Sequence, residues 1–163
     1  AEEALASLAS PASIETPCGT CEGLQLPDGH DLCAVDIVRS GGIMLEAVRR
    51  LCPSLKTAKI LIQRNEETAE PTLYYAKLPE DIVGKRVILC DPMLATGGSA
   101  AMAVGVLRDA GVKEEDILFV ATVAAPEGLR LMAERAPGVR ILTACVDSGL
   151  NERCFIVPGL GDF

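Results

Sequence analysis

The chain has 163 residues, of which 49% are hydrophobic and 23% are charged, and it carries a formal net charge of −8. This length suits one domain with a sizeable core, and so apolar a composition excludes intrinsic disorder. An acidic chain with only 3% aromatic residues lacks the cationic surface and the stacking groups that nucleic acids and anionic membranes need. We therefore expect neither nucleic acid nor a membrane as a partner.

The seven cysteines are an odd number, and several of them lie inside apolar runs. This pattern is typical of buried reduced thiols rather than of a disulfide scaffold. Cys18 and Cys21, with His30 and Cys33 beyond them, also have the spacing of a weak zinc motif. Ordinary thiols are the favoured interpretation, and a zinc site and a redox pair are the two alternatives.

The start of the chain bears on its cellular compartment. It opens with Glu2 and Glu3, where a signal peptide would carry basic residues, and no apolar run approaches the ~20 residues that span a bilayer. Together with the reduced thiols, this predicts a cytoplasmic protein. An organelle reached by a transit peptide that has since been removed stays open as an alternative.

The first 30 residues differ in character from the rest. Proline, glycine and serine occur too often there for regular elements, apart from two helical turns at most over Glu2–Leu8. We predict an irregular, partly ordered N-terminal arm over residues 1–30, followed by the main domain over residues 31–163.

From residue 33 onward, β-branched apolar runs alternate with stretches of helical spacing. The predicted strands are Cys33–Val38, Lys59–Gln63, Thr72–Lys77 (in a hairpin or flap), Arg86–Asp91, Ile117–Ala124 and Arg140–Val146, and the predicted helices are Ile43–Leu51, Ala100–Ala110 and Glu127–Arg135. Such alternation is typical of strands joined by right-handed helical crossovers. The predicted fold class is therefore α/β, a mostly parallel twisted sheet flanked by helices, with a Gly- and Pro-rich loop over residues 147–163.

The segment Asp91–Ser99, Asp-Pro-Met-Leu-Ala-Thr-Gly-Gly-Ser, joins a buried strand to the Ala-rich helix. Open α/β sheets bind ligands at the carboxyl ends of their strands, and loop amides beside a helix N-terminus bind anions. Gly97 and Gly98 allow a phosphate to approach the backbone closely, and Thr96 adds a hydroxyl donor. On glycine count alone, an anion site and a plain helix cap are equally good interpretations.

The same segment resembles the phosphoribosyl pyrophosphate (PRPP) loop of the uracil phosphoribosyltransferase family, in its eukaryotic-like form. Four further segments resemble that family in order and spacing, namely Ile60–Thr68, Ala125–Gly128, Asp147–Glu152 and Ile156–Phe163. The resemblance implies a type I phosphoribosyltransferase fold. It also implies transfer of the phosphoribosyl group of PRPP to uracil, which gives UMP and pyrophosphate in pyrimidine salvage.

The resemblance implies a set of site residues. Arg39 takes the place of an arginine that contacts the pyrophosphate, and Arg64 that of a second PRPP contact, and guanidinium groups suit phosphate oxygens. The residues implied for PRPP are Arg39, Arg64, Asp91, Pro92, Met93, Leu94, Ala95, Thr96, Gly97, Gly98, Ser99 and Asp162. Those implied for uracil, which is recognised largely by backbone groups, are Ile156, Gly161, Asp162 and Phe163.

The resemblance further implies a cofactor and a partner. The cofactor is Mg²⁺, held through the pyrophosphate and ribose oxygens of PRPP rather than by a set of protein ligands. Only Asp91 stands where the wider type I family has two adjacent acids, so we expect no dedicated general base. A homodimer or higher homo-oligomer is the usual state of the family. GTP activates some members, and no residue of this sequence predicts such regulation.

Three departures from the family leave an alternative function open. The N-terminal region is shorter than in the family, the sequence stops at Phe163 where family members continue, and Ser40 replaces the alanine of the usual Arg-Ala-Gly turn. Shortened ends would weaken the uracil lid and the dimer interface. The expected function is the salvage enzyme. The alternative is a protein of the same fold without turnover, with a structural or regulatory role in an assembly.

Overall fold

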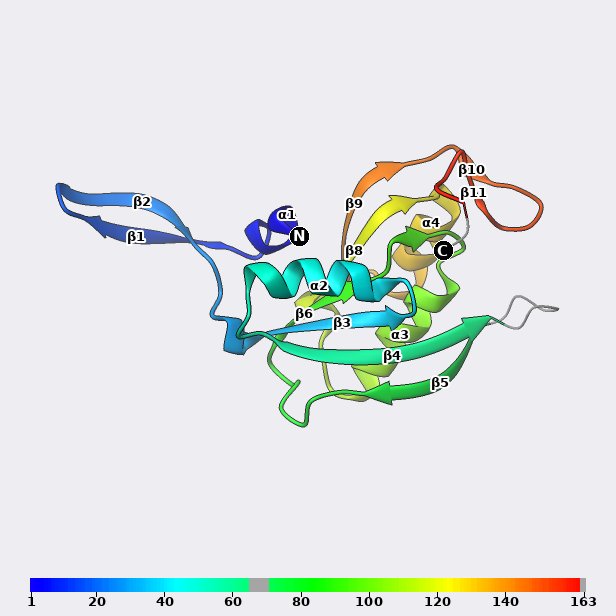
Figure 1. Ribbon diagram of the computed structural model, residues 1–163, viewed down its shortest axis with the longest axis horizontal. Coiled ribbons are helices and arrows are strands. Elements are labelled where there is room, and N and C mark those ends of the chain that lie inside the picture. The colour runs from blue at the N-terminus through cyan, green and yellow to red at the C-terminus, as the bar shows by residue number, and fades with distance from the viewer. Residues whose placement is uncertain (65–70, 162–163) are drawn as a thin grey trace.

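The computed structural model describes residues 1–64 and 71–161, with the backbone alone at Arg64, and a seven-stranded sheet forms its centre (Figure 1). The sheet has the order β5-β4-β3-β6-β8, and both β7 and β9 pair with β8. The strands are β3 (Leu32–Val38), β4 (Lys56–Arg64), β5 (Pro71–Lys77), β6 (Arg86–Cys90), β7 (Met93–Leu94), β8 (Ile117–Ala124) and β9 (Arg140–Val146). All neighbours in this sheet are parallel except β4 and β5, which confirms the predicted fold class.

Helices cover both faces of the sheet, because successive residues of a buried strand point to opposite faces. The helices are α1 (Glu2–Ala6), α2 (Gly41–Leu51), α3 (Gly98–Asp109) and α4 (Pro126–Arg135), with short 3₁₀ turns η1 (Gly29–Asp31) and η2 (Glu114–Asp116). Val35 of β3 lies in the core that α3 and α4 cover. Its neighbour Ala34 lies in the opposite core, which α1 and α2 cover. Because the helices lie over the two faces of the sheet, they do not cover the edge at which the carboxyl ends of the parallel strands meet.

Proline and glycine residues mark the start of one crossover helix and the end of another. Pro126 occupies the first turn of α4, where its missing N–H removes no helical hydrogen bond. Gly111 follows α3 with a φ of +90°, a left-handed conformation that glycine adopts without steric cost. These signals explain why the predicted helices agree with α2, α3 and α4 to within a few residues.

The first 30 residues contain regular structure, so the prediction of an irregular arm was wrong. β1 (Ser10–Thr16) and β2 (Gly19–Gln25) form an antiparallel hairpin that projects from the body of the molecule (Figure 1). Its tip is the two-residue turn of Pro17 and Cys18, since Thr16 pairs with Gly19. Of the turn-forming residues that suggested irregular chain, Pro17 and Gly19 mark the tip of the hairpin, whereas others, such as Pro11 and Gly23, lie within its strands.

The cysteines are all free thiols, but their burial differs from one to another. Cys33 and Cys90 are buried, as predicted for thiols in apolar runs, whereas Cys145 is exposed because β9 lies at the edge of the sheet. Cys18 and Cys21 are exposed on the projecting hairpin. In the part of the chain that the structure describes, no three potential metal ligands gather, so the structure gives no support to the zinc alternative.

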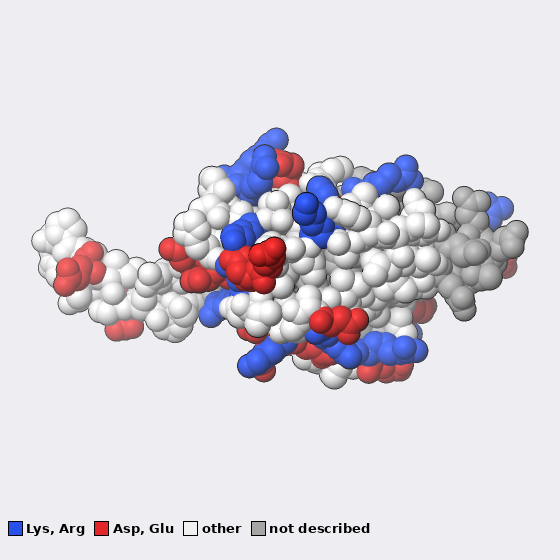
Figure 2. Space-filling model, turned by 90° about the horizontal axis from the view of Figure 1, so that it is seen from below, with Lys and Arg blue, Asp and Glu red and all other residues white. Residues whose placement is uncertain are grey.

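The surface carries charges of both signs. Figure 2 shows Lys and Arg interspersed with Asp and Glu on one face, with acidic groups on the projecting hairpin. None of the helices in residues 1–64 and 71–161 is long and apolar enough to cross a membrane.

Candidate active site

Two of the predicted PRPP segments meet at the carboxyl edge of the sheet. The turn that contains Arg39 follows β3, and Asp91 follows the neighbouring parallel strand β6. The Ser40 hydroxyl donates a long hydrogen bond to Asp91 Oδ1 at 3.4 Å, which links the two turns. Gly41 packs so closely on β6 that an added Cβ would overlap the carbonyl oxygen of Cys90. Arg39 is exposed at this edge, where a phosphate can reach its guanidinium group.

The segment after β6 is held to β8 by backbone hydrogen bonds. The carbonyl oxygen of Pro92 accepts from the N–H of Val123 at 3.1 Å, and that of Leu94 accepts from the N–H of Ala125 at 2.8 Å. The short strand β7 results from this pairing, and the sequence analysis predicted a loop in its place. The pairing fixes the first half of the predicted PRPP loop to the sheet.

The second half of this loop opens α3. Gly97 is the N-cap residue of α3, with a φ of +84°, and no side chain caps the helix there. The first amides of α3 therefore have no N-cap oxygen, although the Gly98 N–H points to Thr96 Oγ1 at 3.5 Å. Amides at the start of a helix bind anions when no side chain satisfies them. The start of α3 thus offers the amides that the anion-site interpretation needs.

Gly128 supports the loop from α4, a role that sequence reasoning missed. A Cβ added at Gly128 would stand 2.5 Å from the carbonyl oxygen of Ala95 and 2.9 Å from that of Leu94. A Cβ at Gly97 would in turn stand 3.0 Å from the Gly128 carbonyl oxygen. The glycine within the Ala125–Gly128 motif was the available signal, and it marks this close backbone contact.

The predicted uracil segment and the predicted PRPP loop share one hydrophobic cluster. Ile156 is buried in a small cluster with Val123 and Ala125, and the loop residues Met93 and Ala95 pack against the same cluster. Two segments that are more than 50 residues apart in the sequence thus form one site.

Side chains near the end of β9 anchor this C-terminal tail. Its strands β10 (Gly149–Leu150) and β11 (Ile156–Val157) pair in an antiparallel manner. Asp147 Oδ2 accepts from the Gly159 N–H at 2.8 Å, and the Ser148 hydroxyl donates to the Val157 carbonyl oxygen at 2.7 Å. Sequence reasoning missed both anchors. The Asp147–Glu152 motif was their only signal.

Three predicted site residues lie wholly or partly outside the part of the chain that the structure describes. Asp162 and Phe163 are outside the described residues, and so is the side chain of Arg64. The backbone of Arg64 pairs with Pro71 across β4 and β5. Pro71 Cγ would stand 3.4 Å from a Cβ added at Gly98, so the end of β4 lies near the start of α3. Gly161 is exposed, with a φ of +88°.

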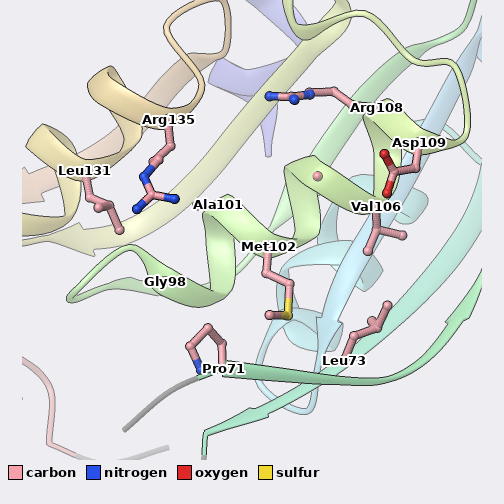
Figure 3. Close-up of a pocket in the computed structure, with 11 residues that line it drawn as sticks. Pro71, Leu73, Gly98, Ala101, Met102, Val106, Arg108, Asp109, Leu131 and Arg135 are labelled. Atoms are coloured by element: carbon pink, nitrogen blue, oxygen red, sulfur yellow. The ribbon is translucent and has the colours of Figure 1, made fainter.

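A cavity of about 780 Å³ lies beside the site, between β5, α3 and α4 (Figure 3). Leu73, Met102 and Leu131 line it with apolar groups, and Arg135 extends from α4 toward α3. The lining of the cavity also includes Gly98, which is one of the residues that the resemblance assigns to PRPP. The cavity therefore borders the candidate active site on the outer side of α3.

Cys90 lies at the end of β6, directly beneath the site. Burial, and then the negative charges of Asp36 and Asp91, raise the pKa of the Cys90 thiol to about 12. The thiol therefore stays protonated near neutral pH and packs in the core, since a nucleophilic cysteine needs a lowered pKa.

The comparisons with known proteins agree with this geometry. The family model for uracil phosphoribosyltransferase matches residues 1–163. A uracil phosphoribosyltransferase of Dictyostelium discoideum is 50% identical over 151 residues, which are 93% of this chain and 69% of that protein. Uracil phosphoribosyltransferase 1 of Schizosaccharomyces pombe is 52% identical over 136 residues, 83% of this chain and 62% of that protein. The chain thus spans about two thirds of the length of these relatives.

Solved structures show the same fold. The AQ2163 protein of Aquifex aeolicus has a TM-score of 0.83 and 37% identity, over 99% of this chain and 76% of that one. A purine phosphoribosyltransferase of Pyrococcus horikoshii, 16% identical with a TM-score of 0.52 over 77% of this chain and 72% of that one, shares the fold alone. With the loop, the Arg39 turn and the tail gathered at one sheet edge, these matches show that the chain belongs to the uracil phosphoribosyltransferase family.

Proposed function

We propose that this chain transfers the phosphoribosyl group of PRPP to uracil, with UMP and pyrophosphate as products. The proposal is carried by one hydrophobic cluster, in which Ile156 is buried with Val123 and Ala125 and against which Met93 and Ala95 pack. It places the segment implied for uracil beside the segment implied for PRPP, so that both substrates would meet at one edge of the sheet. The relatives are named as this transferase, which favours the enzyme over an inactive protein of the same fold.

PRPP would bind through backbone amide groups and arginine side chains. The 5′-phosphate would bind the amides at the start of α3, and the hydroxyls of Thr96 and Ser99 in the same segment would add donors. The exposed guanidinium of Arg39 would take the pyrophosphate, with the side chain of Arg64 as its predicted second cation. These groups concentrate positive charge in a chain of net charge −8.

The reaction forms a bond between uracil N1 and C1′ of PRPP while the bond from C1′ to the pyrophosphate oxygen breaks. The electron pair leaves with pyrophosphate, and the N1 proton passes to solvent. A transition state of oxocarbenium character responds mainly to positioning and electrostatic stabilisation. The anchored tail would hold uracil on the face opposite the leaving pyrophosphate, which gives inversion at C1′.

The described residues fit a Mg²⁺ that enters with PRPP. No group of three or more potential metal ligands occurs in the part of the chain that the structure describes, while the carboxylate of Asp91 stands at the end of β6. Mg²⁺ commonly takes one or two carboxylates together with substrate phosphates and water. When bound, the ion would neutralise charge on the leaving pyrophosphate.

Turnover of labelled uracil with PRPP and Mg²⁺, scored as UMP, tests the proposal. We expect wild-type turnover and a loss of at least about tenfold in kcat/KM for PRPP in Arg39→Ala, because a charge-assisted contact is worth about 1.5–3 kcal/mol. Arg50→Ala is the matched control, since Arg50 is an exposed arginine in the last turn of α2. We expect it to keep wild-type kinetics.

Absence of UMP from folded wild-type protein that still binds PRPP would contradict the proposal and favour the structural or regulatory alternative.

We also propose that the chain forms a homo-oligomer, and sedimentation at several protein concentrations tests this. We further propose a cytoplasmic location, and imaging of the tagged full chain tests it.

A further inference from the structure

The proposed reaction does not use the buried carboxylate of Asp36. Asp36, on β3, is only 1% exposed, and it is the one charged side chain that is buried among the described residues. Both of its carboxylate oxygens accept from Lys59 Nζ on β4, at 3.1 and 3.0 Å. The two residues are direct neighbours in the parallel register of β3 and β4.

This carboxylate lies against the beginning of α2. A Cβ added at Gly41 would stand 3.2 Å from Asp36 Cβ, and one added at Gly42 would stand 3.5 Å from Asp36 Oδ2. Gly41 and Gly42 form the first turn of α2, and they follow directly on Arg39 and Ser40. The ion pair therefore touches the turn that presents Arg39.

Stability alone is a poor explanation for a charge at this position. Leu32 and Ala34, on the same face of β3, are buried apolar residues, so the fold accommodates apolar side chains there. A carboxylate loses its hydration when it is buried, and an ion pair with a partner whose side chain is 59% exposed offsets only part of that loss. A carboxylate beneath a helix N-terminus, however, interacts favourably with the helix dipole and holds that end in place.

We propose that Asp36 and Lys59 are a positioning pair that fixes residues 39–42 and thereby directs Arg39 at the pyrophosphate of PRPP, an inference that rests on the proposed function. Lys59 has a second effect, because its charge offsets the Asp36 carboxylate, which would otherwise repel the pyrophosphate. Both effects concern PRPP, and we assign the pair no role in binding uracil.

Steady-state kinetics of Asp36→Asn and Lys59→Met test this inference. We expect both variants to raise KM for PRPP roughly tenfold or more, since small misplacements of a binding group have large effects, and to leave KM for uracil within about twofold. Lys59→Arg should restore a KM for PRPP near that of wild type. The Lys59 side chain is 59% exposed, so its variants should fold even if Asp36→Asn does not.

Lys56→Met is the matched control. It breaks the 2.6 Å ion pair of Lys56 with Asp81 at the opposite end of β4, away from the turn. We expect an unchanged KM for PRPP. A KM for PRPP within about twofold of wild type in folded Lys59→Met, or an equal change in Lys56→Met, would overturn the inference.

The two proposals fail in different ways. If wild-type protein forms no UMP, the proposed function fails, and calorimetric titration of wild type and Lys59→Met with PRPP and Mg²⁺ still decides the role of the pair. If wild type turns over and Lys59→Met binds PRPP as tightly, only the positioning role fails.

Discussion

Gly128 lies where α4 touches the PRPP loop, and an added Cβ would stand 2.5 Å from the Ala95 carbonyl oxygen. Because that neighbour is backbone, it has to move as a whole segment when a side chain is introduced. We expect Gly128→Ala to lower the free energy of unfolding by about 1–3 kcal/mol, as overpacking does, and to raise KM for PRPP. Chemical denaturation and steady-state kinetics measure the two effects.

Gly105→Ala serves as the control for this substitution. Gly105 lies inside α3, and nothing stands within 4 Å of an added Cβ. Alanine there should raise the free energy of unfolding by about 0.5–1 kcal/mol through helix propensity, with no change in KM. An unchanged KM for PRPP in Gly128→Ala would show that this contact does not position the loop.

The buried thiols make the protein sensitive to alkaline pH. Burial raises the pKa of Cys90 from 9.0 to about 12. The folded state thus holds this proton more tightly than the unfolded state, so the contribution to stability is complete below pH 9 and is lost as the pH rises toward 12. We expect the free energy of unfolding to fall above pH 9 by about 1 kcal/mol per pH unit for this thiol.

Denaturation of Cys90→Ala from pH 8 to 10.5 checks this expectation. The variant should lose less stability per pH unit than wild type, whereas Cys145→Ala, at an exposed thiol, should follow wild type. Identical slopes for wild type and Cys90→Ala would refute the assignment.

At the scale of elements, the Asp147 carboxylate is one of the two side chains that anchor the C-terminal tail beside the site. Asp147, at the end of β9, accepts from the Gly159 N–H at 2.8 Å. We expect Asp147→Ala to loosen the segment that follows Ile156, and so to raise KM for uracil severalfold with little change in KM for PRPP. The control is Asp109→Ala, which removes the same charge from an exposed aspartate at the end of α3. A rise confined to KM for PRPP would argue against the role given to the tail.

At the scale of the whole molecule, α1 belongs to the core although it precedes the projecting hairpin. Leu5 is 5% exposed and packs in the cluster with Leu45 and Val48 of α2. We expect Leu5→Ala to lower the free energy of unfolding by about 2–5 kcal/mol, which is typical of truncation in a core. Leu24→Ala, at a hairpin residue that is 65% exposed, should change it little. Equal losses in the two variants would mean that the hairpin is also packed in solution.

The sequence by itself determined the α/β class, the order of the main strands and helices from β3 to β9, and the segment that joins β6 to α3, but not the short strand β7 within that segment. It could do so because apolar periodicity and the glycine and proline signals are local properties of the chain. The same locality explains the error at the N-terminus. The turn residues of a projecting hairpin look like those of an irregular arm when the pairing of Ser10–Thr16 with Gly19–Gln25 is unknown.

Only the tertiary structure decided which residues gather at the site. Ile156 and Met93 share one hydrophobic cluster, Gly128 lies against the Ala95 carbonyl oxygen, and Asp36 lies near Gly42 and pairs with Lys59. Each of these contacts joins segments that are distant in the sequence or depends on the strand register. Backbone approach and burial of a charge arise from the packing of the whole chain, and no local pattern in the sequence encodes them.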